Sequence, residues 1–199
     1  AINSDDTISG AVPIGFSFNY AGNTYTNVYA SSNGFLSFNA SSANSAFNSM
    51  GAPAATSIPL IAPLWDDLDG FSTGAASYLT TGTAGNRVFT FEWLNWEWNY
   101  TTSAATISFQ VKLYEADGKI EFVYRPDAAA VSSPSASAGL VGTTAGNYLS
   151  LSDLSATATA STTVPSNSIA LKPVAGQVFT FTRAIQPVIS WTSASNLFT

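Results

Sequence analysis

A two-residue alternation of apolar and polar side chains over residues 106–125 constrains the fold of this chain more than any other feature. The stretch TISFQVKLYE carries apolar residues at 107, 109, 111 and 113, and KIEFVYR carries them at 120, 122 and 124, with the turn signal ADG between. Successive side chains of a β-strand point to opposite faces of its sheet, so each run has one apolar face. The segment therefore predicts an antiparallel hairpin with one buried face.

Short runs with the same alternation recur along most of the chain. Turn signals such as AGN at 21–23 and NG at 33–34 separate some of them, and Ser/Ala/Thr-rich stretches at 128–138 and 152–168 separate others. Many short strands at hairpin spacing are typical of two packed sheets. We therefore expect residues 1–183 to form one all-β domain, an antiparallel two-sheet sandwich similar to a jelly roll, with long Ser/Thr/Ala-rich loops. The runs are IGFSFNY, TYTNVYA, FLSF, RVFTFEW, AGLVGT, NYLSLS, SIALKP and QVFTFTR.

The surface of such a domain must consist mostly of uncharged polar residues, because charged residues make up only 9% of the chain. Soluble domains usually carry about 25%. A surface of Ser, Thr, Asn and Gly is typical of secreted β-proteins, so we expect an extracellular or cell-surface location. The net charge of −6 argues against a nucleic-acid partner, and no apolar run is long enough for membrane insertion. Without cysteine or histidine, the chain has no disulfide framework and no imidazole base.

Residues 184–199 form a separate segment in this interpretation. FTFTR is suitable as the last strand of the domain. AIQPVISWTSASNLFT then begins another strand after Pro187. The segment is either the start of a following domain or a strand or linker that packs on a neighbouring copy. In the second case Trp191 is a candidate interface residue.

The stretch FEWLNWEWNY at 91–100 concentrates aromatic residues and changes its alternation in the middle. Phe91 and Trp93 occupy odd positions, whereas Trp96, Trp98 and Tyr100 occupy even ones. Either a bulge near 94–95 keeps all of them on one face of the strand, or the second set points away from the first.

Three interpretations of Trp96, Trp98 and Tyr100 stay open. The rings could stack on sugars, with Glu97 and Asn99 binding hydroxyl groups beside them. They could form an apolar contact with another subunit, because aromatic residues are enriched at interface cores. They could also be buried in the sandwich while Glu97 and Asn99 face solvent.

The segment WDDLDG places three carboxylates, those of Asp66, Asp67 and Asp69, within four residues. Their mutual repulsion calls for compensation, and Ca²⁺ prefers hard oxygen ligands, so the segment is a candidate calcium site. The alternative is that these acids accept backbone hydrogen bonds in a turn. No other cofactor is indicated.

A glycosidase would need two carboxyl groups about 5–10 Å apart across a cleft. Asp66 or Asp69 could pair with Glu92 or Glu97, but nothing in the sequence singles out one pair. Glycoside hydrolysis is therefore only the third function to consider.

Three short motifs are candidate glycosylation sites. NAS at Asn39 and NYT at Asn99 match the N-glycosylation sequon, and DTI around Thr7 resembles an O-glycosylation site of Bacteroidetes-type bacteria. Each motif is also compatible with a plain solvated loop.

Four segments resemble, in order, those of nidogen-like (NIDO-type) extracellular domains: YTNVYASSNGFLSF, IPLIAPLWDDLDG, VFTFEWLNW and ISFQVKLYEADGKIEFVY. The resemblance covers mainly residues 14–125 and extends to 183. The chain is also similar to β-rich modules at the front of large secreted surface proteins of Bacteroidetes-type bacteria. Immunoglobulin-like repeats often follow those modules, and PVISWTSASNLFT resembles the start of such a repeat. The chain departs from the family at Leu64, where an aromatic residue is usual, and in the extra tryptophans after Trp93.

The resemblance implies adhesion and surface architecture, and it implies no catalysis. We therefore expect a non-catalytic structural or adhesive module of a bacterial cell-surface adhesin or filament. Such a module acts through self-association or through contacts with neighbouring surface-protein domains. The alternative is a carbohydrate-binding module that uses Trp96, Trp98 and Tyr100, with a glycan as its partner.

Overall fold

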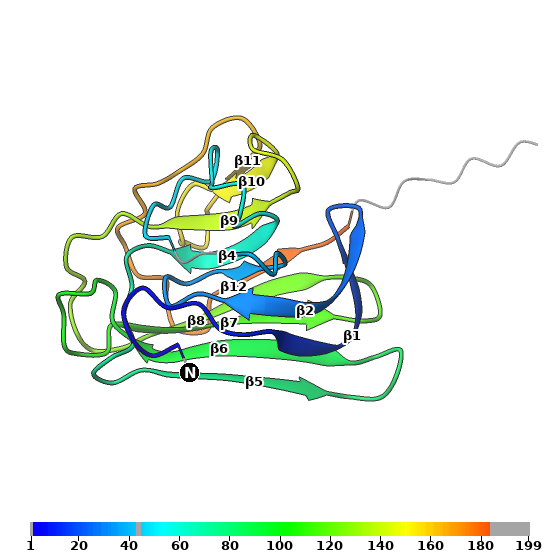
Figure 1. Cartoon of the computed structure of the whole chain (residues 1–199). Coiled ribbons are helices and arrows are strands. Elements are labelled where there is room, and N and C mark those ends of the chain that lie inside the picture. The colour runs from blue at the N-terminus through cyan, green and yellow to red at the C-terminus, as the bar shows by residue number, and fades with distance from the viewer. Residues whose placement is uncertain (1, 43–44, 184–199) are drawn as a thin grey trace, which may run out of the picture.

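Residues 2–42 and 45–183 are described by a computed structural model in which every regular element is a β-strand (Figure 1). Twelve strands form two antiparallel sheets that pack as a sandwich. The prediction of an all-β, two-sheet sandwich is therefore confirmed. No helix in these residues is long and apolar enough to cross a membrane. Trp191 and the rest of segment 184–199 lie outside the described residues.

The larger sheet has seven strands in the order β1-β2-β3-β4-β9-β10-β11, and the smaller has five in the order β12-β8-β7-β6-β5. The larger sheet contains β1 (Val12–Tyr20), β2 (Asn23–Ala30), β3 (Leu36–Ser37), β4 (Leu60–Trp65), β9 (Ser137–Val141), β10 (Tyr148–Leu151) and β11 (Ala160–Ser161). The smaller sheet contains β5 (Ala75–Thr81), β6 (Val88–Trp96), β7 (Ile107–Tyr114), β8 (Ile120–Pro126) and β12 (Val178–Phe181). The edges of the smaller sheet are therefore β5 and β12.

The hairpin of β7 and β8 is the one that the alternation predicts. The two strands pair antiparallel, with Leu113 opposite Ile120 and Phe109 opposite Tyr124. These apolar residues are buried, whereas Gln110 on the outer face is half-buried. Burial of one face of each strand fixes the register, because a slip by one residue would turn every side chain to the other face.

One apolar core fills the space between the two sheets. In β1, every second residue from Val12 to Tyr20 is buried, as the alternation predicts. In the smaller sheet, Trp93 stacks on Phe109 with ring centroids 4.9 Å apart. Both sheets therefore contribute one apolar face to a shared interior.

A second apolar cluster covers the outer face of β4. Trp65 packs against Phe35 with ring centroids 5.2 Å apart, and its Nε1 donates to the carbonyl oxygen of Ser45 at 2.7 Å. Met50, from the loop before β4, joins this cluster. Because β4 is buried on both faces, its sequence LIAPLW is apolar throughout and does not alternate.

The structure differs from the predicted strands in the last third of the chain. SIALKP forms no strand, and only Ile169 makes an isolated bridge, to Ala136. Pro173, at the end of this run, has no N–H to give to a ladder. The sequence alternation also misses β5, because Tyr78 and Leu79, on opposite faces of that strand, are both exposed.

Candidate functional site

The aromatic stretch runs along β6 and into the loop that follows it. The ladder between β6 and β7 shifts between Trp93 and Trp96, so a bulge at Leu94 and Asn95 inserts one extra residue. Asn95 has a φ of 54°, a left-handed conformation that asparagine adopts more readily than most residues. The bulge keeps the odd-numbered and the even-numbered aromatic residues on one face, which is the first of the two predicted arrangements.

The indole rings of Trp93, Trp96 and Trp98 are completely buried. The Nε1 of Trp93 donates to the carbonyl oxygen of Ser31 at 3.0 Å, and that of Trp96 donates to the carbonyl oxygen of Ser32 at 2.9 Å. Trp93 and Trp96 therefore fasten β6 to the turn between β2 and β3. A sugar platform needs exposed ring faces, so the prediction of a platform that includes Trp96 and Trp98 is wrong.

Only Tyr100 among the three predicted platform residues is exposed, with 51% of its surface accessible. Glu97 is fully buried, and Asn99 is half-buried. The expectation that Glu97 faces solvent is therefore also wrong. The cause is the end of β6, where Glu97 forms a two-way backbone bridge with Asp69.

Asp66 has a structural role in the packing of the segment that follows β6. Its Oδ2 accepts the indole N–H of Trp98 and the backbone N–H of Ser135, both at 2.8 Å. Its Oδ1 accepts the hydroxyl of Ser135 at 3.0 Å and the backbone N–H of Asp67 at 2.9 Å. With both oxygens occupied by donors, Asp66 does not fit the predicted role of a calcium ligand, and it fits the alternative of a turn acceptor.

Asp69 and Glu97 lie side by side, because partners in an antiparallel bridge direct their side chains to the same face. Asp69 Oδ1 accepts the backbone N–H of Phe71 at 2.9 Å, and Glu97 Oε1 accepts that of Ser72 at 3.2 Å. Glu97 Oε2 is buried without a hydrogen-bond partner. Burial raises the pKa of Glu97, and the neighbouring carboxylate of Asp69 raises it further.

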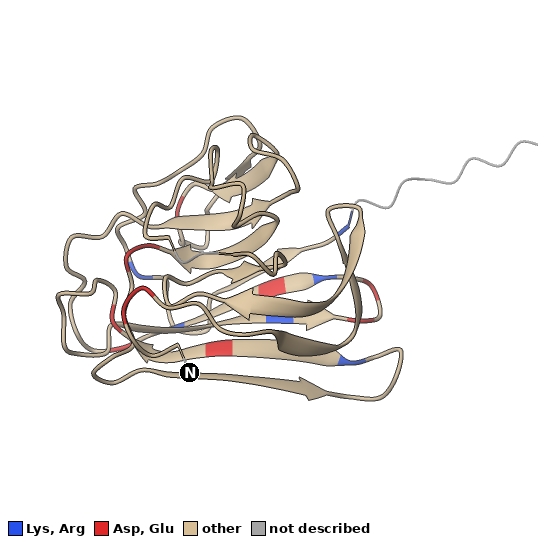
Figure 2. Cartoon of the chain, viewed as in Figure 1, with Lys and Arg blue, Asp and Glu red and all other residues tan. Residues whose placement is uncertain are grey.

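The carboxylates that converge in the described part of the chain are those of Asp5, Asp6 and Asp67, which each bring an oxygen within 4.8 Å of the others. Figure 2 shows the acidic N-terminal loop and the acidic loop after β4 at the same end of the sandwich. Partial burial raises the pKa of Asp67 to about 6, with further increases from Asp5, Asp6, Asp66 and Asp69. Of the predicted set of Asp66, Asp67 and Asp69, only Asp67 belongs to this cluster.

Asn33 joins the two acidic loops. Its Nδ2 donates to Asp6 Oδ1 at 3.1 Å, and its Oδ1 accepts the backbone N–H of Leu68 at 3.0 Å. The next residue is Gly34, with a φ of 77°, and a β-carbon there would lie only 1.9 Å from the carbonyl oxygen of Leu64. The Ser-Asn-Gly turn is thus shaped by close packing against β4.

Sequence reasoning missed Asp5 and Asp6 as part of this cluster. They stand 61 or more positions before Asp67 in the chain, so no spacing rule connects them. The N-terminal segment is placed by a bridge between Ile8 and Ser31 and by the Ser32 N–H, which donates to the Thr7 carbonyl at 2.8 Å. The adjacent Asp-Asp pair was the one available signal.

The carboxylates considered for glycoside hydrolysis fall into separate environments. Glu92 lies on the outer face of the smaller sheet, whereas Glu97 is fully buried and Asp69 is 6% exposed. Asp66 is equally enclosed, at 5% exposed. No pair among them is brought together across an open cleft in the residues that the structure describes.

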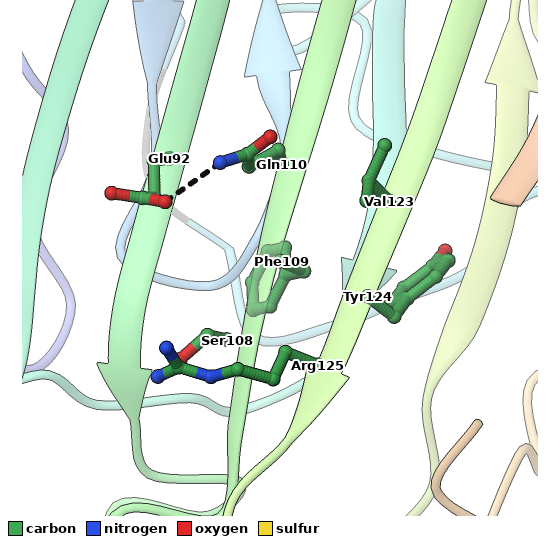
Figure 3. A pocket seen from close by; sticks show the side chains of 7 residues that line it. All are labelled: Glu92, Ser108, Phe109, Gln110, Val123, Tyr124 and Arg125. Carbon is green, nitrogen blue, oxygen red and sulfur yellow. Dashed lines mark hydrogen bonds between the residues drawn. The ribbon is translucent and has the colours of Figure 1, made fainter. Parts of the chain in front are cut away.

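The outer face of the smaller sheet carries two shallow hollows, of about 160 and 310 Å³. Figure 3 shows the first of them, where the side chains of Glu92 and Gln110 meet at 2.7 Å. Nearby, Arg125 donates to the hydroxyl of Ser108 at 2.8 Å and pairs with Asp127 at 3.0 Å. The polar groups of this face are therefore largely bonded to one another.

The three candidate glycosylation residues lie in loops. Thr7 Oγ1 donates to the carbonyl oxygen of Asp5 at 3.1 Å, so this hydroxyl helps to hold the N-terminal turn. Asn39 and Asn99 are half-buried, and each side-chain Oδ1 accepts a backbone N–H two residues ahead, at 2.9 Å and 3.0 Å. Their modification stays a prediction.

A family model described as NIDO related matches residues 1–183. No curated protein and no solved structure matches the chain.

Proposed function

The chain belongs to the NIDO-related family, and on that premise we propose that residues 1–183 are a non-catalytic extracellular module that acts through contacts with other protein chains. The observation that carries this proposal is the family match, which spans both sheets of the sandwich. The setting that we propose is a bacterial cell-surface adhesin or filament. The partners are further copies of the chain or neighbouring domains of surface proteins.

The shape of the smaller sheet supports a macromolecular partner. Pockets that enclose small ligands usually measure about 300–1,000 Å³ and bury most of the ligand. One hollow on this face, of about 160 Å³, is smaller than that range, the other, of about 310 Å³, is at its lower limit, and both are shallow. A broad face of this kind offers more contact to another protein surface than to a small molecule.

The placement of the acids supports a role without catalysis. A general acid or base must reach its substrate within hydrogen-bonding distance. Glu97 and Asp69 are buried beneath the turn that contains Phe71 and Ser72, and Asp66 is saturated with donors. These side chains serve the packing of this end of the sandwich instead.

The first experiment is negative-stain electron microscopy of the native material, beside the sizing of recombinant residues 1–199. We expect filaments or regular oligomers in the native material and concentration-dependent assembly of the recombinant chain. A native preparation that holds only monomers would contradict the proposed structural role. Hydrolysis of a polysaccharide that is lost with one acid-to-amide substitution would contradict the proposed lack of catalysis.

We also propose that Ca²⁺ binds at Asp5, Asp6 and Asp67. Three carboxylate oxygens within 4.8 Å of one another form a set of hard donors that suits this ion. A bound cation would relieve the repulsion that adds to the effect of burial in raising the pKa of Asp67.

Thermal unfolding with and without calcium tests this proposal. At about 100 times the dissociation constant, a ligand that binds only the folded state adds ~2.7 kcal/mol, or roughly 5–10 °C for a domain of this size. We expect chelator to abolish this shift and Asp67→Asn to remove it. The exposed Asp117, whose Oδ1 caps a turn at Lys119 N, provides the matched control Asp117→Asn. Equal calcium responses in both variants would exclude Asp67 as a ligand.

A further inference from the structure

The edge strand β5 is long and regular. It pairs with β6 through seven consecutive residue pairs, from Ala75 opposite Leu94 to Thr81 opposite Val88, without a register shift. β5 is the last strand of the smaller sheet, so its outer side has no neighbour in that sheet (Figure 1). An edge of this kind presents a row of unpaired backbone groups.

The ladder on the other side of β6 identifies those groups. The N–H of Glu115 donates to the carbonyl oxygen of Arg87, so Arg87 faces β7. Backbone groups alternate in direction along an antiparallel strand, so residues 88, 90, 92 and 94 face β5. Their partners on β5 are residues 81, 79, 77 and 75. Ala76, Tyr78 and Thr80 therefore direct their N–H and C=O groups outward, and no described residue forms a hydrogen bond with them.

The other edge strands have structural features that disfavour pairing with a strand of another chain. β1 contains Pro13 and Gly15 within an irregular stretch of its ladder. The carbonyl oxygens of Ile14 and Gly15 already accept from the side chains of Thr80 and Arg87. β11 has two residues and β12 has four. Short, irregular or proline-containing edges are the usual protection against edge-to-edge association.

β5 has none of these features. Its sequence AASYLTT contains no proline and no charge, and the nearest charged residues in the chain are Asp69 and Arg87. Tyr78 is 49% exposed and Leu79 is 64% exposed, and they lie on opposite faces of the strand. A strand added at this edge would cover apolar surface on both faces of the sheet.

We propose that β5 is a self-association edge, at which two copies of the chain pair their β5 strands antiparallel around Tyr78. This inference rests on the proposed function in one respect, since it names a second copy as the protein partner. In that register, Ala76 of one copy lies opposite Thr80 of the other, and the two Tyr78 residues lie opposite each other. All three outward-facing residues then meet outward-facing residues, and each pair exchanges two backbone hydrogen bonds.

The choice of a second copy follows from charge and symmetry. Each chain carries a net charge of −6, but the stretch from Gly70 to Asn86 is uncharged, so two identical edges can approach without direct repulsion. Antiparallel pairing of a strand with itself is isologous, which closes the assembly as a dimer with two-fold symmetry. The two Tyr78 rings lie on the same face and form an aromatic cross-strand pair. The result is a continuous sheet that joins the smaller sheets of both copies.

Tyr78→Pro and Tyr78→Thr form a matched pair of variants for the test. Both variants lose the ring, but only proline removes the outward N–H, and neither removes a hydrogen bond to β6. Leu79→Lys is a second variant, because it places a charge at an exposed position of the edge. Circular dichroism and thermal unfolding confirm that each variant is folded.

Sedimentation equilibrium of residues 1–199 and amide hydrogen exchange by NMR are the measurements. We expect a dimer in which the amides of Ala76, Tyr78 and Thr80 gain protection as concentration rises. We expect Tyr78→Pro and Leu79→Lys to raise the dissociation constant by about tenfold or more, and Tyr78→Thr by less. A wild-type chain that stays monomeric at millimolar concentration would overturn the β5 proposal.

The same measurements separate this proposal from the proposed function. If the chain assembles while the amides of β5 stay unprotected and the variants behave like the wild type, the β5 edge is excluded and the structural role stands. If the native material contains no assemblies at all, the structural role fails by its own experiment, whatever the recombinant chain does.

Discussion

Glu115 illustrates how a single side chain holds a loop in this protein. One of its oxygens accepts the backbone N–H of Gly85 at 2.8 Å and that of Arg87 at 3.1 Å, and its carboxylate pairs with the Arg87 guanidinium. The same guanidinium lies 5.5 Å above the ring of Phe16. Arg87 and these hydrogen bonds lower the pKa of Glu115 to about 2. The loop between β5 and β6 is thus tied to both β7 and β1.

Replacement of Glu115 by glutamine should weaken this link in a pH-dependent way. Since the pKa of Glu115 is 4.5 in the unfolded chain and about 2 in the folded one, its stabilising contribution is complete above pH 4.5. That contribution is lost as the pH falls from 4.5 to 2. We expect Glu115→Gln to lower the melting temperature at pH 7 and to flatten its decline over that acid range. Parallel acid curves for the two proteins would contradict this assignment.

The acidic residues show which contacts of single residues cannot be predicted from the sequence. The sequence correctly marks WDDLDG as a place where acids need compensation, but three acids in four residues do not reveal which of them is already bonded. Asp66 is saturated by Trp98 and Ser135, and the latter lies 69 residues away. Asp67 meets Asp5 and Asp6 from the other end of the chain. Such pairings depend on the folded arrangement of loops, which no local pattern encodes.

Among the elements, β6 shows the strongest link between backbone geometry and burial. Without the extra residue at Leu94 and Asn95, Trp96 and Trp98 would point to the opposite face from Trp93. The left-handed φ of Asn95 is supported by its side chain, whose Oδ1 accepts from Arg125 at 2.9 Å. One bulge therefore decides whether two tryptophans are core or surface.

The bulge should be sensitive to the shape of the residue at position 95. A branched side chain in the left-handed region costs about 1–2 kcal/mol, so Asn95→Val should lower the free energy of unfolding by at least that amount. Asn95→Gly tolerates the same φ and should cost less. Urea unfolding of both variants is the measurement, and equal losses would show that backbone strain is not the cause.

The predictability of the other elements follows their burial pattern. β1, β7 and β8 were found because one face of each is buried and the other is not. β4 is buried on both faces, and β5 has an exposed apolar residue on each face, Tyr78 on one and Leu79 on the other, so neither sequence shows the alternation that marks a strand. Alternation in the sequence reports a difference in burial between the two faces of a strand. It is absent where the two faces do not differ clearly in burial.

For the whole molecule, the contact between sheets decides whether the sandwich unfolds as one unit. Tyr124 is 1% exposed in β8, and its Oη donates to the carbonyl oxygen of Pro63 in β4 at 2.6 Å. Proline has no N–H, so Pro63 contributes only this acceptor. The bond crosses the apolar core and joins the two sheets directly.

Removal of this hydroxyl tests the coupling between the sheets. Tyr124→Phe leaves a buried carbonyl without its partner, which should cost about 1–3 kcal/mol. Tyr25→Phe is the control, because the Tyr25 ring packs on Phe38 and its hydroxyl makes no hydrogen bond in the described residues. We expect near- and far-ultraviolet circular dichroism to report a single shared transition in urea. Separate transitions would indicate that the sheets unfold independently.

The buried tryptophans also give the folded chain a spectroscopic signature. Trp65, Trp93, Trp96 and Trp98 are all 0% exposed, and each indole N–H is bonded to a protein oxygen. Excited indole rings that are shielded from water emit at shorter wavelength, and dissolved quenchers such as iodide do not reach them. Three of these rings, Trp93, Trp96 and Trp98, lie on β6 and on the segment after it that packs against Asp66, so their share of the emission reports on whether this part of the sandwich is folded.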